Sequence, residues 1–269
     1  MAKKESTLVN LVLTLFIICF VASATLGFMY VLTKEPIAAA KAKKINNAIQ
    51  QVLPMSEINA RLYKELQAKM EKSSGKERKN IQQQLDSVGL LSRFDNDPTQ
   101  DKFYRLVVSQ TNDPLLQGLI FYPNSDSSEF FSEPLDNTKL TKYSAMDYLE
   151  FYPASRSGQL VGVAIKTFSD IGFGSRIELM IGFRPDGTIQ STSVIKHAET
   201  PGLGDKMDKD KSEWSNQFDE KNPNKFKLKV KKDGGDVDAI TASTISSRAF
   251  CDATKRAFEA FIINNDSIH

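Results

Sequence analysis

The feature that most constrains this chain is an uncharged apolar run near its N-terminus. From Leu8 to Leu32 the sequence reads "LVNLVLTLFIICFVASATLGFMYVL", and it contains no charged side chain. A helix needs roughly 20 apolar residues to cross a bilayer. The "ASA" triplet at 22–24 is typical of a signal-peptide cleavage site, but the apolar run extends well beyond the usual length of a signal sequence. We therefore expect a short tail over 1–7 and a retained transmembrane helix over 8–32, with a cleaved signal peptide as the alternative.

The composition of the remaining chain is that of an ordinary folded protein. Of 269 residues, 41% are hydrophobic and 25% are charged, with a formal net charge of +2. This near-neutral balance gives no sign of a nucleic-acid partner. Two cysteines and two histidines are too few for a disulfide framework or for most metal sites. We accordingly predict no metal site.

Residues 33–102 have the pattern of a helical linker. A helix is expected after Pro36 and is ended by Pro54. A second helical stretch has apolar residues at four-residue spacing, is interrupted at "KSSGKERK", and then resumes its pattern. These two stretches predict a helical hairpin that packs on its own domain or on a partner.

The period of the pattern changes at Phe103. Short runs rich in β-branched and aromatic residues predict strands at "FYRLVVSQ", "GLIFYP", "LVGVAIKTFS" and "FKLKV". The clearest hairpin is "IELMIGFRPDGTIQSTSVIKHAE", with its turn at Pro185-Asp186-Gly187. A last helix should bury Phe250, Thr254, Ala257 and Phe261. The prediction for 103–269 is a single α+β domain.

Two loops contain several glycines, which allow a backbone to approach a ligand closely. They are "DIGFGS" at 170–175 and "HAETPGLGD" at 197–205. Ordinary tight turns are the alternative for both. His197 could act as a base, although a histidine that ends a strand is more often structural. No Ser-His-Asp arrangement is recognisable, so we predict no catalytic residue.

The stretch "DAITASTISSR", 238–248, is rich in hydroxyl groups just before the last helix. Ser, Thr and Asp are the preferred N-caps of helices. A helix N-terminus also favours a phosphate, which a hydroxyl there could hold or be esterified to. Spacing alone leaves both interpretations open.

The order of these motifs resembles the family of Rnf G subunits. The segments that carry the resemblance are "TKEPIAAAKAKK", "GFGSRIELMIGFRPDGTI", "HAETPGLGDKM" and "DAITASTISSRA", which follow one membrane span. More distantly, the chain is similar to the C subunit of the sodium-translocating NADH:quinone reductase. Both belong to the FMN-binding domain family. The resemblance is poor over 55–101, which we interpret as an insertion that does not contact the flavin.

The resemblance implies that a flavin transferase esterifies FMN through its phosphate to Thr244. Asp238 and Thr241 match the attachment motif, and Ser246 matches its closing hydroxyl. The chain departs from the motif at 242, where Ala replaces the usual Gly and adds a Cβ at a position expected to be tight, and at Ser243, where Ala is usual. The full set of implied FMN-binding residues is Thr244, Asp238, Thr241, Ser243, Glu199, Thr200, Gly202, Leu203 and Gly204.

The implied function is electron transfer by a membrane-anchored subunit of an ion-translocating ferredoxin:NAD oxidoreductase. Its implied partners are the membrane, the other membrane subunits of the Rnf complex and the flavin transferase. The resemblance places the domain on the outer side of the inner membrane. The lysines that follow the span, at 34, 41, 43 and 44, weakly favour the cytoplasm instead. Alternatives are the flavin subunit of the quinone reductase and a cofactor-free membrane-anchored assembly or binding protein.

Overall fold

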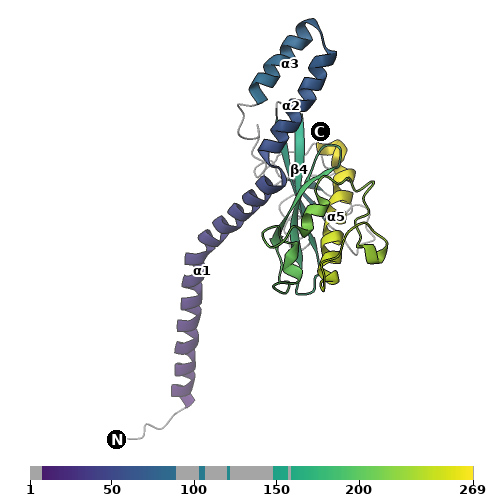
Figure 1. The fold of residues 1–269 in the computed structure, drawn as a ribbon. Coiled ribbons are helices and arrows are strands. Elements are labelled where there is room, and N and C mark those ends of the chain that lie inside the picture. Colours follow the sequence, from purple (N-terminus) through teal and green to yellow (C-terminus); the bar gives the residue numbers. More distant parts are fainter. Residues whose placement is uncertain (1–7, 89–102, 107–119, 122–147, 157–158, 269) are drawn as a thin grey trace. The chain divides into compact units, whose positions relative to one another are not determined.

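The computed structural model describes residues 8–88, 103–106, 120–121, 148–156 and 159–268 (Figure 1). The chain divides into two compact units, Met1–Ile45 and Asn46–His269. Helix α1, Leu8–Val52, begins in the first unit and ends in the second. The segments expected before and after Pro36 therefore form one helix.

The first unit consists of the apolar part of α1. Its large side chains are exposed, and its mean hydropathy reaches 2.5 over an 18-residue window. Within the described residues it is the one helix long and apolar enough to cross a membrane. The hydroxyls of Thr14, Thr25 and Thr33 each donate to the carbonyl four residues earlier at 2.7 Å. These hydroxyls are therefore satisfied without water, as a lipid environment requires.

The second unit is built on a six-stranded antiparallel sheet in the order β2-β1-β3-β4-β5-β6. Strand β3 was not predicted, because Pro153 and its charged neighbours interrupt the apolar pattern, yet it pairs with both β1 and β4. The predicted hairpin joins β5 to β6, and Gly187 takes a φ of +80° in its turn. The strands are β1 Phe103–Leu106, β2 Ile120–Phe121, β3 Tyr148–Arg156, β4 Gln159–Ser169, β5 Ile177–Phe183 and β6 Ile189–Lys196.

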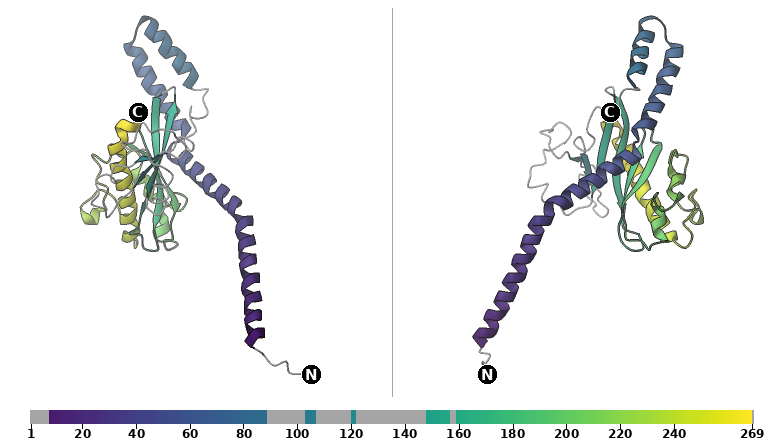
Figure 2. Two further views of the ribbon diagram at one scale, coloured as in Figure 1. Left: turned by 180° about the vertical axis from the view of Figure 1, so that it is seen from behind. Right: turned by 60° about the vertical axis from the view of Figure 1, so that its left-hand side comes forward.

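The last helix, α5 (Thr244–Ile268), covers one face of this sheet (Figure 2). On β4, the Thr167 hydroxyl donates to the Ala253 carbonyl of α5 at 2.9 Å. The four side chains expected to be buried on α5 are all buried, Phe250 and Phe261 among them. The predicted amphipathic helix is therefore confirmed, and it forms the main core with the sheet.

The end of α1 and the start of the helical hairpin cover the opposite face. A Cβ at Gly162 of β4 would lie 2.8 Å from Leu53, and Gly162 and Thr167 point to opposite faces because strand side chains alternate. The predicted hairpin is confirmed as α2, Met55–Lys72, packed against α3, Gly75–Val88. Arg61 of α2 donates to the Val161 carbonyl at 2.7 Å, so the hairpin packs on its own domain.

Between β6 and α5 the chain forms three short 3-10 helices. They are η2 (Gly204–Met207), η3 (Trp214–Phe218) and η4 (Lys231–Asp233). The strand predicted at "FKLKV" is wrong. Its alternation arises because Leu228 and Val230 are buried, while the backbone forms local turns and one isolated bridge to Val237.

Candidate functional site

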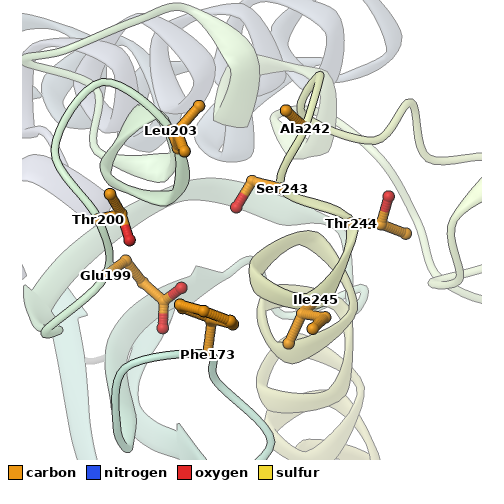
Figure 3. Close-up of a pocket in the computed structure, with 8 residues that line it drawn as sticks. All are labelled: Phe173, Glu199, Thr200, Leu203, Ala242, Ser243, Thr244 and Ile245. Atoms are coloured by element: carbon orange, nitrogen blue, oxygen red, sulfur yellow. The ribbon is translucent and has the colours of Figure 1, made fainter.

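Three segments that are far apart in the sequence enclose a cavity of about 330 Å³ at the start of α5 (Figure 3). One wall is the loop after β6, a second is the first turn of α5, and the third is the loop between β4 and β5. The lining residues are Phe173, Glu199, Thr200, Leu203, Ala242, Ser243, Thr244 and Ile245.

Glu199 joins the three walls. Its side chain is buried, with 5% of its surface exposed. One carboxylate oxygen accepts a hydrogen bond from the Gly174 amide at 3.0 Å, and the other accepts one from the Ser246 hydroxyl. His197 Nδ1 in turn accepts a hydrogen bond of 3.1 Å from the Glu199 amide, which gives this histidine a structural role.

Glycines allow the walls to approach one another this closely. A Cβ at Gly174 would lie 1.8 Å from the Ala198 carbonyl oxygen, and one at Gly204 would lie 2.6 Å from the Ser246 hydroxyl. Both distances are shorter than any real contact of a Cβ, so no larger residue fits at either position without a shift of the backbone. Gly202 has another purpose, since it takes a φ of +75° in a turn and has open space around it.

The first turn of α5 presents unpaired amides. Ser247 donates its amide to the Ser243 carbonyl at 3.1 Å, which closes the first helical turn. Among the residues that the structure describes, none accepts a hydrogen bond from the amides of Thr244, Ile245 or Ser246. Free amides and the helix dipole make such a terminus favourable for a phosphate group.

Two hydroxyls at this turn differ in direction. Ser243 points toward the Glu199 loop, whereas Thr244 points away from it in the view of Figure 3. The Ser243 hydroxyl lies 2.7 Å from the Ser246 hydroxyl, which donates to Glu199. Ser243 is therefore engaged within the protein, while no hydrogen bond of the Thr244 hydroxyl is found in the described part of the chain.

The mouth of the cavity is apolar and open. Phe173 is 68% exposed, Ile245 45% and Leu203 39%. Exposed side chains of this size gather rarely on a soluble domain unless they contact a ligand or partner. The arrangement offers flat apolar surfaces beside a site suited to an anion.

The structure brings together five of the nine residues implied by the resemblance: Thr244, Ser243, Glu199, Thr200 and Leu203. The other four, Asp238, Thr241, Gly202 and Gly204, do not line the cavity, although Gly204 packs directly behind Glu199. Sequence reasoning did not select Phe173 or Ile245. The place of Phe173 between two glycines was the available signal.

Ala242 departs from the motif for a different reason than expected. The side chain is exposed, so its Cβ is not crowded. Its φ is +62°, in the left-handed region where only glycine is free of strain. The usual glycine at this position is therefore explained by backbone conformation.

Comparison with known protein families gives this site its context. Residues 172–259 match the FMN-binding domain family, and this range contains all eight residues that line the cavity. The segment is an FMN-binding domain. Its match begins at the loop that carries Phe173 and continues into α5.

Similarity to a set of curated proteins extends this comparison, and each of them is named as the G subunit of an ion-translocating oxidoreductase complex. The protein from Vibrio atlanticus is 38% identical over 120 residues, which cover 44% of this chain and 57% of that protein. The protein from Erwinia tasmaniensis is 41% identical over 108 residues, 39% and 51% of the two chains. The protein from Shewanella piezotolerans is 39% identical over 112 residues, 40% and 53%. This chain thus spans about half the length of the curated relatives that it matches.

Proposed function

We propose that this protein is a membrane-anchored electron-transfer subunit that carries FMN covalently, through a phosphoester to Thr244, in an Rnf-type ion-translocating oxidoreductase complex. The observation that carries the proposal is the position of Thr244. It is the first residue of α5, beside three unpaired amides and at the mouth of an apolar cavity within the FMN-binding domain.

The residues at the start of α5 fit a phosphate. The amides of Thr244, Ile245 and Ser246 can donate to its oxygens, and the positive end of the helix dipole favours its charge. Esterification joins the Thr244 oxygen to the phosphorus of a flavin dinucleotide. The nucleoside monophosphate leaves, and the hydroxyl proton passes to a base of the flavin transferase.

The cavity mouth fits the flat ring of a flavin. Phe173, Leu203 and Ile245 offer the apolar surface against which such a ring can lie. When bound, FMN supplies the one- and two-electron chemistry, and the protein supplies its position and surroundings. Glu199, which the resemblance places against the flavin, is suited to hold the three walls in place because both of its carboxylate oxygens are bonded within the protein.

The relatives support membership of an ion-translocating complex. Those reported above are named as the G subunit of such a complex, and none of them is named as part of a quinone reductase. We propose that 8–32 anchors the protein in the inner membrane, that 33–102 links this anchor to the flavin domain over 103–269, and that this domain lies on the outer side, next to the other membrane subunits.

Mass spectrometry of the full-length protein, produced together with a flavin transferase, tests the covalent linkage. We expect an FMN-sized addition on the peptide that contains Thr244, its loss in Thr244→Ala, and its retention in Thr244→Ser and Ser243→Ala. An unmodified wild-type peptide from cells with an active transferase would sink the proposal. Retained modification in Thr244→Ala would move the ester to another hydroxyl.

The side of the membrane is tested separately. A reporter that is active only outside the cytoplasm, fused after His269, should give a signal equal to that of a known exported control. Activity of a cytoplasmic reporter at the same position would place the domain on the inner side, as the lysines after the span suggest.

A further inference from the structure

The segment that precedes Thr244 is exposed but held in place. Asp238, Ala239, Thr241 and Ala242 are all exposed to solvent. An exposed stretch without regular structure would ordinarily sample many conformations. Here side chains from two other elements, η3 and α5, bond directly to its backbone.

Gln217 of η3 contacts both polar groups of one residue. Its side-chain oxygen accepts a hydrogen bond from the Asp238 amide at 2.8 Å, and its side-chain nitrogen donates to the Asp238 carbonyl at 3.2 Å. The Trp214 indole donates to the same carbonyl at 2.5 Å. The side chains of η3 thus occupy the positions that a neighbouring strand would otherwise take.

A second fixed point lies next to Thr244. The buried Ser247 hydroxyl accepts a hydrogen bond from the Ile240 amide at 2.9 Å and donates to the Ser243 carbonyl at 3.0 Å. The Ser243 amide donates back to the Ile240 carbonyl at 2.9 Å. The backbone is therefore fixed at both ends of the exposed residues Thr241 and Ala242.

The side chains of the segment remain accessible to another protein. The Asp238 carboxylate makes only an exposed ion pair with Lys231, which costs little to break. In the described part of the chain, the Thr241 hydroxyl has no hydrogen-bond partner. The clamp made by Gln217 and Trp214 acts on the backbone and leaves these groups available.

We propose that Gln217 and Trp214 are positioning residues for flavin attachment: they hold the segment from Asp238 to Thr244 in the conformation that the modifying enzyme binds. The inference rests on the proposed esterification of Thr244. A segment that is ordered before binding does not lose conformational entropy in the complex. Loss of the clamp should therefore weaken recognition by the transferase and leave the chemical step intact.

The test measures modification of the full-length protein in detergent by a flavin transferase and flavin adenine dinucleotide. Gln217→Ala removes both hydrogen bonds to Asp238, and Trp214→Phe removes one donor while retaining an aromatic ring against Phe250. The matched control is Asn216→Ala, an exposed side chain on the same η3. Hydrogen exchange at the Asp238 amide and the melting temperature are recorded for each variant.

We expect Gln217→Ala to raise the KM for the protein substrate about tenfold, as the loss of two hydrogen bonds predicts, with kcat unchanged. Exchange at the Asp238 amide should become faster, and Trp214→Phe should have a smaller effect in the same direction. Asn216→Ala should behave as wild type. A partly unfolded variant would instead show a lower final extent of modification.

Two results overturn the inference and can be told apart. Wild-type KM in Gln217→Ala, despite fast exchange at Asp238, would show that the transferase does not use the ordered segment while the esterification itself stands. A wild-type protein that is not modified at all would overturn the proposed function, and with it the role of the clamp.

Discussion

The Gly174 amide donates a hydrogen bond of 3.0 Å to the Glu199 carboxylate, and this contact joins the Phe173 loop to the loop after β6. The same carboxylate accepts from Ser246 of α5. Glu199→Ala should therefore leave two buried donors unpaired and destabilise the fold by about 2–4 kcal/mol. Glu199→Gln retains an acceptor for Gly174 and should cost about half as much. Chemical denaturation measures both values.

The control for this prediction is Glu259→Ala, which removes an exposed carboxylate from α5. Its only described partner is Lys255 at the next turn, so the change should be within about 0.5 kcal/mol. Equal stability of Glu199→Ala and Glu259→Ala would contradict the role of Glu199 as the contact between the walls.

Ala242→Gly should stabilise the protein. The φ of +62° costs an alanine about 1 kcal/mol relative to glycine, even after the greater freedom of glycine in the unfolded chain is included. Ala239→Gly is the matched control, because Ala239 has a negative φ and should lose stability from the same entropy term. A lower melting temperature for Ala242→Gly would show that the left-handed conformation is not strained.

Local sequence patterns were sufficient for much of this fold. The spacing of Phe250 and Phe261 predicted the buried face of α5, and Pro185-Asp186-Gly187 predicted the turn between β5 and β6. Both signals lie within one element or turn. Alternation in "FKLKV" failed because a loop that covers the core can bury every second residue as a strand does.

The site needed information that no local pattern contains. Glu199 bonds to residues 25 and 47 positions away, and these contacts determine that its carboxylate is buried. The attachment motif placed Thr244 at a helix start, but it could not show that Phe173 forms the third wall. Long-range packing, which depends on the whole sheet, brought these segments together.

Phe173→Ala should change the surroundings of a bound flavin without changing the fold. Its ring is 68% exposed, so removing it loses little burial, and the melting temperature should stay near that of wild type. With one apolar wall absent, iodide should quench the flavin fluorescence more strongly. Ile262→Ala is the control, because this exposed side chain of α5 does not line the cavity. Unchanged quenching in Phe173→Ala would contradict its contact with the ring.

Cys251 should make stability fall at alkaline pH. Burial on α5, together with the nearby carboxylates of Asp233 and Asp252, raises the pKa of its thiol from 9.0 to about 12. The unfolded chain releases this proton near pH 9, whereas the folded chain retains it, so the free energy of unfolding decreases as the pH rises from 9 to 12. The slope is at most about 1.4 kcal/mol per pH unit. Below pH 9 the effect is absent.

Cys251→Ala separates this thiol from other groups that titrate at high pH. The variant should lose some stability at all pH values and show a weaker decrease above pH 9 than wild type. Identical slopes for the two proteins in denaturant titrations would contradict the raised pKa.

Arg61→Ala should loosen the helical hairpin without affecting flavin attachment. Arg61 donates to the Val161 carbonyl at 2.7 Å and to the Gln190 side chain at 3.3 Å, and burial lowers the pKa of its guanidinium. Loss of hydrogen bonds from a charged group should cost about 2 kcal/mol. The cavity lies on residues from other elements, so the extent of Thr244 modification should equal that of wild type. Lys64→Ala, an exposed position on α2, is the stability control. A stable Arg61→Ala protein that cannot be modified would mean that α2 takes part in attachment.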